Sequence, residues 1–378
     1  MPDQHLQPLS SYGIDATTGF VPSEVPLTAL PPAYAPWDAI IASLSPLLRS
    51  HKLRAAINAM PELEFGPEHS ALAQERALLL LTMLGNAWVW SGPSPDFRIP
   101  SSLAKPLWTV AQRLDRPPIV HFAGMNLYNW RKIDPSLPVS MDNATMIAQF
   151  LGGVDEDWFF IVTLGVELAG APMLPCAVAA VAAAESGDTK TVTHNLERIA
   201  VTMIEVQRAL TRMREWCDPH MFYHRIRPWV AGWPAPGAVY EGVSETPVVY
   251  VGGSAGQSAL IQSLDALLGI EHTAASGYLK MIRAYMPVGH RRFVQDVERL
   301  SKVRALCKTS GGAAAKAYDH TVAEVDKFRR MHMGLAVDYI NKPSGKATGE
   351  LGTGGTDFTA FLRDARLTTV RAKIEGEA

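Results

Sequence analysis

The chain contains little cysteine. Among its 378 residues there are three cysteines, Cys176, Cys217 and Cys307, and they form neither a CxxC pair nor a CxxCH motif. This spacing excludes the common cysteine-rich zinc sites and a prosthetic group attached through CxxCH. Few and scattered cysteines are typical of proteins in a reducing compartment, so we expect the protein to be cytoplasmic.

The chain also lacks a strong excess of charge. Its formal net charge is −2 and it has no long basic run, which argues against a nucleic-acid or anionic-membrane partner. Residues 1–15 are polar and lack the apolar core of a signal peptide. The most apolar long stretch, residues 159–184, contains Glu167, Pro172 and Pro175. We therefore interpret it as two buried core segments rather than a membrane span.

Alternating β-strand patterns are scarce, and no repeat of about 20 to 50 residues is present. Apolar residues recur at helical spacing instead, and hydrophobic residues make up 47% of the chain. We predict an all-α fold with a large core. A polar link at residues 132–138 predicts a boundary between a small helical N-terminal domain with an irregular arm, residues 1–138, and a large helical domain, residues 139–378.

The helical patterns differ in strength along the chain. The clearest lie at residues 37–51, 53–60, 68–90, 103–114, 162–169, 174–186, 188–213, 258–268, 277–286, 291–306 and 325–340. Residues 248–251 fit either a short strand or an apolar approach to the glycines that follow.

The helix predicted at residues 325–340 has one apolar face with a histidine, His332, in its middle. The pattern alone favours a core histidine over a metal ligand. Arg329, one turn before His332, strengthens the second interpretation, because a haem needs an iron ligand and a cation for a propionate. No HExxH motif and no second histidine four residues on support a zinc site.

Two glycine-rich segments surround this helix in sequence. Residues 252–258, GGSAGQS, precede a predicted helix, and Ser254 or Ser258 is a suitable N-cap. No GK[ST] follows, so the segment is not a phosphate-binding P-loop. Residues 349–357 form a Gly/Thr loop, which is either a linker or a lid that excludes water.

The sequence FRRMHMGLAVDYI followed by GTGGTDF resembles the C-terminal end of the indoleamine 2,3-dioxygenase family, as a bacterial-type member. The resemblance extends from about Tyr12 to Arg366 and includes GGSAGQS and HFAGMNLYNW. It implies a helical protein with haem between its two domains. In the family, the histidine that corresponds to His332 is the proximal ligand of haem b, which is ferrous in the active enzyme.

The resemblance also implies roles for other residues. Ser254 and Ala255 correspond to residues at the haem edge, and Asp265 matches a position near the haem, although a surface charge or an arginine partner remains equally open. Arg227 matches the arginine that pairs with the substrate carboxylate, with Arg225 as its competitor. The residues that correspond to the pocket wall and the lid contact are Phe122, Met125, Phe159, Phe160, Thr163, Phe222 and Thr353.

The function that the resemblance implies is insertion of both atoms of O₂ across the indole C2–C3 bond of L-tryptophan or a related indoleamine, giving N-formylkynurenine, with a reductant to keep the iron ferrous. No distal histidine or carboxylate is obvious in the predicted pocket, so we expect no protein base. Two alternatives remain open: a related haem enzyme acting on a modified tryptophan, as in the ring rearrangement of pyrrolnitrin synthesis, and a non-catalytic haem or gas sensor.

Overall fold

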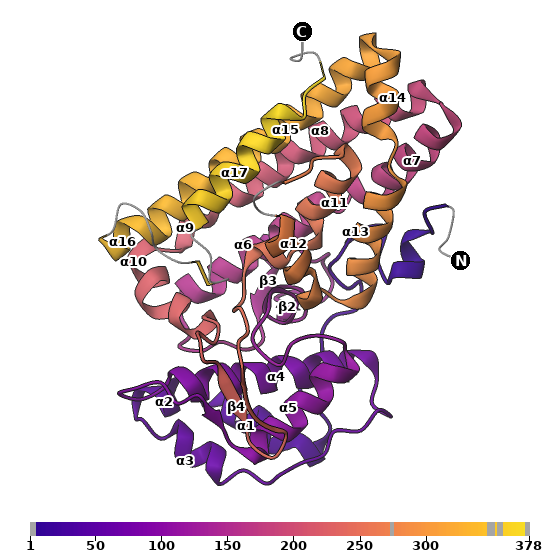
Figure 1. The fold of residues 1–378 in the computed structure, drawn as a ribbon. Helices are drawn as coiled ribbons and strands as arrows, with labels where there is room; N and C mark the ends of the chain where they lie inside the picture. Colours follow the sequence, from indigo (N-terminus) through magenta and orange to yellow (C-terminus); the bar gives the residue numbers. More distant parts are fainter. Residues whose placement is uncertain (1–4, 273–275, 346–351, 354–357, 375–378) are drawn as a thin grey trace.

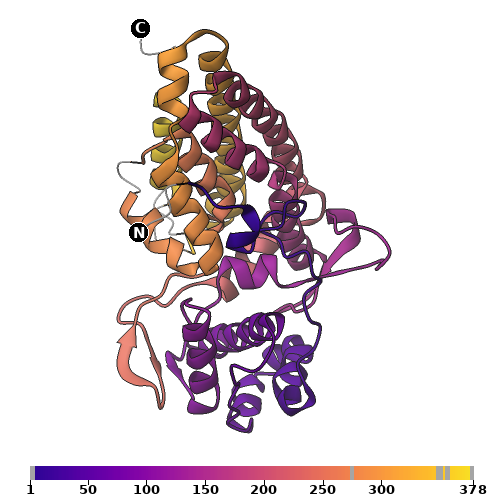
Figure 2. The ribbon, with the colours of Figure 1, turned by 90° about the vertical axis from the view of Figure 1, so that its right-hand side faces the viewer.

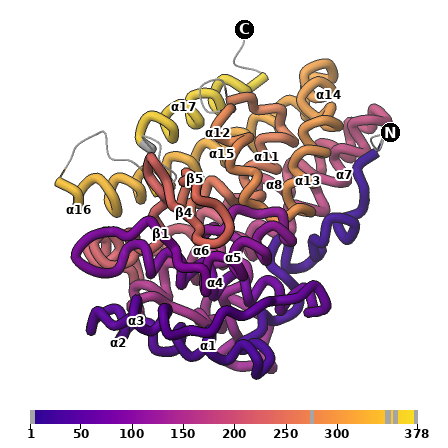
Figure 3. Tube along the Cα trace, turned by 60° about the horizontal axis from the view of Figure 1, so that its bottom comes forward, coloured from indigo at the N-terminus to yellow at the C-terminus, as the bar shows by residue number. Residues whose placement is uncertain are grey.

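A computed structural model describes residues 5–272, 276–345, 352–353 and 358–374. In these residues helices form most of the backbone and the strands are short, which confirms the predicted all-α class. Figures 1 and 3 show the first five helices gathered at one end of the molecule. They are α1 (Ala35–Ala42), α2 (Leu44–Arg49), α3 (Leu53–Asn58), α4 (Ala71–Trp90) and α5 (Ser101–Arg113).

The other end of the molecule is built from longer helices that run side by side (Figure 1). Helix α15 packs against α8 and α17, and α8 in turn packs against α6 and α7. These helices are α6 (Val154–Gly170), α7 (Met173–Ser186), α8 (Thr189–Thr211), α11 (Ala259–Leu268), α13 (Val288–Leu300), α14 (Val303–Ser310), α15 (Gly312–Ala336) and α17 (Phe358–Arg371).

Helix α8 illustrates how the sequence specifies these elements. Its N-cap, Asp188, accepts a hydrogen bond from the backbone amide of Thr191 at 3.0 Å, which satisfies an amide that the first turn leaves unpaired. A stripe at helical spacing, Leu196, Ile199 and Met203, is fully buried against the neighbouring helices.

Three π-helical turns interrupt the regular helices. They are η3 (Ala123–Leu127), η5 (Phe222–Ile226) and η9 (Val337–Asn341), and each contributes side chains to the cavity described below. A π turn inserts one residue into the helical ladder and redirects the side chains around it, and such turns are frequent at functional sites. The remaining short helices are α9 (Met213–Trp216), α10 (Pro219–Met221), α12 (Ser276–Ile282) and α16 (Lys342–Ser344).

Two small sheets accompany the helices. Strand β1 (Arg98–Ile99) pairs in parallel with β4 (Ala238–Tyr240), which pairs antiparallel with β5 (Ser244–Val248); β2 (Trp130–Lys132) and β3 (Ala144–Met146) form an antiparallel pair. The β4–β5 hairpin reaches from the second half of the chain to the first five helices (Figures 1 and 2).

The first part of the N-terminal arm, up to about Phe20, lies against the C-terminal helices (Figure 2), and its later part reaches α1, where the Leu30 amide donates to Asp38 at 2.8 Å. The Tyr12 hydroxyl donates to the Asp296 carboxylate on α13 at 2.8 Å, and the Phe20 ring lies 4.7 Å from that of His290. A Cβ at Gly289 would lie 2.0 Å from the Tyr12 carbonyl oxygen, so this approach requires glycine. The predicted division at residue 138 stays a prediction, and both the arm and the β4–β5 hairpin cross it.

Two predicted helices are each divided in the structure. The pattern at residues 37–51 forms α1 and α2 with a break at Ser43, and the pattern at 291–306 ends at Leu300 and resumes at Val303. At the second break, the Ser301 hydroxyl donates to the Leu267 carbonyl at 2.6 Å. This tertiary hydrogen bond to α11 has no local sequence signature.

The apolar stretch that we interpreted as two core segments forms two helices. By length and composition alone, residues Val154–Ser186 are apolar enough to cross a membrane, but 67% of the most apolar window is buried inside the protein. Helices α6 and α7 meet at Ala171–Pro172, where the chain turns.

Burial lowers the pKa of His121 and of His290 to about 3 and that of His332 to about 4. In the unfolded chain these histidines have the ordinary pKa of about 6.5. Below pH 6.5, and down to the lowered pKa values, the unfolded chain therefore binds more protons than the folded protein. The free energy of unfolding should therefore fall as the pH drops through this window, by at most about 1.4 kcal/mol per pH unit for each histidine.

We predict that His290→Phe, next to Phe20, makes stability less sensitive to acid. The difference between the urea midpoints at pH 7 and pH 5 should shrink relative to the parent protein. His320→Gln, at an exposed position on α15, is the matched control and should leave that difference unchanged. An unchanged difference in His290→Phe would contradict the prediction.

Candidate active site

A cavity of about 320 Å³ lies between α6, α11, α15 and the π-helical turns. All thirteen residues that the sequence singled out line it, although they come from segments up to 231 positions apart, from Phe122 to Thr353. They are Phe122, Met125, Phe159, Phe160, Thr163, Phe222, Arg227, Ser254, Ala255, Asp265, Arg329, His332 and Thr353. The prolines, glycines and π turns of the connecting segments bring them together.

His332 occupies one wall, on the cavity face of α15. Its ring lies parallel to that of Phe328, with 6.2 Å between centroids and 9° between planes. Burial, together with the nearby Arg329 charge, lowers the pKa of His332 to about 4, so the ring is neutral at pH 7. Within the part of the chain that the structure describes, neither ring nitrogen has a hydrogen-bond partner. A neutral imidazole in this setting offers a lone pair to a metal.

Arg329 and Asp265 form an ion pair beside this histidine. The Arg329 Nη2 donates to both Asp265 carboxylate oxygens, at 2.5 and 2.6 Å. Burial would raise the pKa of Asp265, but Arg329 and His272 outweigh it and lower that pKa, so the carboxylate is charged. Asp265 is thus an arginine partner, one of the alternatives that the sequence left open.

The Arg329 side chain is only partly satisfied by this pair. Its Nε is buried and has no hydrogen-bond partner in the described residues. A buried donor without a partner costs free energy, and an anionic group in the cavity would remove that cost. Together with the neutral His332, this donor fits a cofactor that presents both a metal and an acidic group. No cluster of three or more His, Cys, Asp or Glu side chains suited to a metal occurs among the described residues.

Part of the cavity lining is aromatic. Phe159 and Phe222 lie 4.5 Å apart, and Phe160 meets Phe159 edge to face at 5.1 Å. The Thr163 hydroxyl donates to the Phe159 carbonyl at 2.9 Å, so its proton is directed to its own helix. These side chains form flat apolar walls of the kind that hold an aromatic ligand.

Arg227 provides the second cation at this cavity. It lies where η5 ends, and its guanidinium carbon is 5.2 Å from the centre of the Tyr223 ring. Arg225, its competitor in the sequence, is exposed and does not line the cavity. The two arginines, two residues apart in a helical segment, therefore point in different directions.

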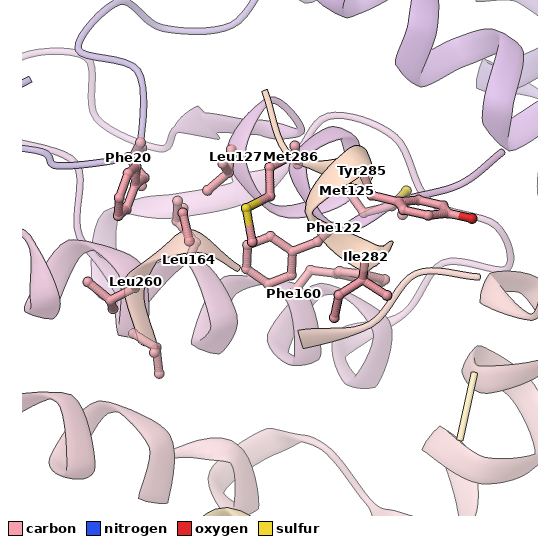
Figure 4. Packing of buried hydrophobic residues seen from close by; sticks show 14 of the residues in the cluster. Phe20, Phe122, Met125, Leu127, Phe160, Leu164, Leu260, Ile282, Tyr285 and Met286 are labelled. Atoms are coloured by element: carbon pink, nitrogen blue, oxygen red, sulfur yellow. The ribbon is translucent and has the colours of Figure 1, made fainter. Parts of the chain in front are cut away.

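Phe122 and Met125 form the inner end of the cavity. Figure 4 shows them packed with Phe160, Ile282 and Met286. The backbone amide of Phe122 donates to Oε1 of Gln257 at 2.9 Å, and Nε2 of that glutamine donates to the Gly252 carbonyl at 2.9 Å. The buried Gln257 side chain thus holds the inner end of the cavity against the glycine segment.

The glycine segment provides two N-caps and part of the cavity lining. Ser254 and Ser258 cap the short helices that follow them, and Ser254 and Ala255 also line the cavity. A Cβ at Gly252 would lie 2.1 Å from the Val230 carbonyl oxygen, so only glycine fits there.

Thr353 rests on this glycine segment. The Gly252 amide donates to its carbonyl at 3.0 Å, and its hydroxyl donates to the Gly253 carbonyl at 2.6 Å. Of the Gly/Thr loop, the structure describes only Gly352 and Thr353; residues 349–351 and 354–357 lie outside the described part.

A histidine and a carboxylate in the cavity wall escaped the sequence analysis, in which no distal histidine or carboxylate was obvious. His121 precedes Phe122, and both of its ring nitrogens are engaged, with Nδ1 2.9 Å from the Ile119 carbonyl and Nε2 3.1 Å from Arg116. Glu167 lies one turn after Thr163 on α6, a helical spacing that could have identified it. Ser258 donates to Glu167 Oε1 at 2.5 Å, and Glu167 Oε2 is buried with no partner in the described residues.

A largely apolar cavity lined by a neutral imidazole and by aromatic rings is suited to keep a reactive centre away from water. The class that this cavity and the helical fold define is that of helical oxidoreductases.

Comparison with known proteins specifies the family. Residues 8–372 match the family model described as Indoleamine 2,3-dioxygenase. The chain is 34% identical over 405 residues to indoleamine 2,3-dioxygenase 1 of Rattus norvegicus, covering 99% of each chain. It is 30% identical over 431 residues to indoleamine 2,3-dioxygenase of Saccharomyces cerevisiae, covering 98% of this chain and 95% of the relative. A 6-hydroxytryptophan 2,3-dioxygenase of Fusarium equiseti is 30% identical over 395 residues, with 96% and 97% covered. The chain therefore belongs to the indoleamine 2,3-dioxygenase family.

Glu167 allows a test of the cavity's polarity. Burial raises the pKa of Glu167 to about 7. Between pH 4.5 and 7, Glu167 is protonated in the folded protein and ionised in the unfolded chain. The contribution of Glu167 to the free energy of unfolding therefore falls as the pH rises through this range. This sign is opposite to that of the buried histidines.

We predict that Glu167→Gln removes this loss. The variant should gain stability relative to the parent as the pH rises from 5 to 7, by at most about 1.4 kcal/mol per pH unit. Urea midpoints at the two pH values measure it, and the exposed Glu205→Gln is the control. A stability difference between variant and parent that does not change with pH would refute the prediction.

Proposed function

We propose that the protein is a haem-dependent dioxygenase that inserts both atoms of O₂ across the indole C2–C3 bond of L-tryptophan, giving N-formylkynurenine. The observation that carries the proposal is the pairing, one helical turn apart, of a neutral cavity-facing His332 with an Arg329 whose Nε is unsatisfied. The family membership supports the same conclusion.

The residues present fit a haem. His332 would ligate the iron, Arg329 would meet an acidic edge, and the small side chains of Ser254 and Ala255 would let the backbone approach a flat ring. When bound in the ferrous state, the haem supplies the activation of O₂. Asp265 acts on this site through Arg329, because its carboxylate contacts that side chain at 2.5 Å.

The remaining wall suits tryptophan. Phe159, Phe160 and Phe222 offer faces and edges to an indole, and Arg227 offers a cation to the substrate carboxylate. The Thr353 hydroxyl donates its hydrogen bond to the Gly253 carbonyl. The lone pairs of the hydroxyl oxygen can then accept a hydrogen bond from the substrate ammonium.

His121, one of the titratable side chains in the cavity wall, does not offer a base to the indole. The tautomer of His121 is fixed by the Ile119 carbonyl, which accepts from Nδ1, so Nε2 accepts from Arg116. Burial lowers the pKa of His121 to about 3, so this ring stays neutral. The walls therefore position the substrate and exclude water, and they leave the oxidation to the cofactor.

Substrate breadth is the main open choice within this proposal. The relative from Fusarium equiseti is named for 6-hydroxytryptophan. The inner end of the cavity here is Phe122 and Met125, which offer no hydrogen bond to a ring hydroxyl. We therefore favour the unsubstituted indole. The buried free cysteines agree with a reducing, cytoplasmic location, where a reductant would keep the iron ferrous.

A single aerobic assay tests the function. Reduced, haem-loaded protein is given L-tryptophan under labelled dioxygen, and we expect N-formylkynurenine that carries both labelled atoms. His332→Ala should lose the haem absorbance and the product together. Unchanged tryptophan with intact haem would favour a sensor, and a different oxidised indole would favour the ring-rearranging enzyme.

We predict that Arg227→Gln raises KM for L-tryptophan by about tenfold or more, because a charge-assisted contact to the carboxylate is lost. Its haem spectrum should match that of the parent. Arg225→Gln, two residues away and exposed, is the matched control and should leave KM unchanged. Equal effects of the two substitutions, or none, would remove Arg227 from the substrate site.

A further inference from the structure

A buried chain of four side chains connects the C-terminal helix to the cavity. The Arg329 Nη2 binds the Asp265 carboxylate, Nε2 of His272 lies 3.0 Å from Asp265 Oδ2, and Nδ1 of His272 lies 2.7 Å from the hydroxyl of Thr368 on α17. Asp265, His272 and Thr368 are each less than a tenth exposed. His272 and Thr368 lie outside the cavity wall, and the proposed reaction does not require either.

The carboxylate fixes the direction of this hydrogen-bonded chain. An ionised Asp265 only accepts, so Nε2 of His272 must carry a proton. The Thr368 hydroxyl lies 3.0 Å from the carbonyls of both Asp364 and Ala365, so it can either donate to Nδ1 or accept from it while donating to its own helix. Thr368 therefore satisfies the ring in both of its charge states, and Asp265 Oδ2 is held from two sides.

The orientation of the Asp265 carboxylate determines where the Arg329 guanidinium lies. Both carboxylate oxygens bind the same nitrogen, Nη2, and Nε has no partner among the residues that the structure describes. If Asp265 Oδ2 lost His272, the carboxylate could rotate and engage a second nitrogen of the guanidinium. Arg329 would then turn toward α11, and its free donor would no longer serve the cavity.

We propose that His272 and Thr368 are positioning residues that orient Asp265 and thereby keep a donor of Arg329 available to an anionic group of the cofactor. This inference rests on the proposed haem function. In this proposal, Thr368 makes helix α17 contribute to the orientation of the residues at the cofactor site.

The test measures how fast haem leaves the ferric holoprotein when excess apomyoglobin captures it. We expect about tenfold faster loss in His272→Leu and a smaller acceleration in Thr368→Val, because partners beyond the ligands commonly tune affinity to this extent. His272→Gln should stay within about twofold of the parent, since an amide can donate to Asp265 and accept from Thr368. The double variant His272→Leu/Thr368→Val should lose haem no faster than His272→Leu alone.

The matched control loosens the same helix by another route. Arg366 on α17 pairs with Asp326 on α15 at 3.0 Å and is not part of the buried chain. Arg366→Gln should lower the melting temperature and leave the rate of haem loss unchanged. A rate increase equal to that of Thr368→Val, a His272→Gln variant as fast as His272→Leu, or no change in His272→Leu would each overturn the proposal.

A second measurement needs no haem. In the apoprotein, Thr368→Val and Arg329→Gln lie at opposite ends of the chain of contacts, so their effects on the urea midpoint should be non-additive. Additive effects would overturn the coupling. If the parent protein bound no haem while this cycle remained non-additive, the haem function would fail and the coupling would stand.

Discussion

The burial of a neutral imidazole beside a charged guanidinium is the constraint on which the site depends. His332 keeps its lone pair because burial and the Arg329 charge disfavour its protonation. That charge could not remain in an apolar cavity by itself, since an unpaired buried ion costs several kcal/mol. Asp265 compensates it at 2.5 Å. Asp265 does not satisfy every donor of the guanidinium, because Arg329 Nε has no hydrogen-bond partner in the described residues. The ion pair therefore stabilises the buried charge and still leaves one N–H group that can bind an anion.

The fold supplies this arrangement by combining long regular helices with local irregularities. Helix α15 gives a rigid support for Phe328, Arg329 and His332, because it packs along α8 and α17. The other wall comes from π turns, which place Met125 and Phe222 toward the cavity. A regular helix at η5 would put Arg225 and Arg227 about 200° apart, and the structure indeed exposes the first and directs the second to the cavity. The regular helix α15 therefore carries the residues proposed to hold the iron and an acidic group, whereas both the regular helix α6 and the irregular turns carry residues proposed to meet the substrate.

Many helices and cavity residues could be predicted from the sequence. The features that could not be predicted have identifiable physical reasons. Periodicity located the long helices, and the family resemblance, together with the pattern around His332, identified thirteen of the residues that line the cavity, although their roles remain proposals. The break at Ser301 depends on a hydrogen bond to Leu267, and the β1–β4 pairing joins residues about 140 positions apart, so neither has a local signal. Glu167 was passed over as an interruption of an apolar run, although its spacing from Thr163 placed it on the cavity face. His272 could not be found, because its importance arises only from contacts with Asp265 and Thr368.

The two cations of the cavity have opposite requirements, and the structure treats them differently. Arg329 is held by a buried carboxylate, which fixes its position and lowers its attraction for any further anion. Arg227 lies over the Tyr223 ring, and an aromatic face supports a cation without neutralising it. A permanent cofactor suits the first arrangement, because exact placement matters more than strength of attraction once the metal is ligated. A substrate that must bind and leave suits the second, because an aromatic face holds the cation in place and preserves its charge. The different neighbours of the two arginines therefore support the proposed division of the cavity into a cofactor side and a substrate side.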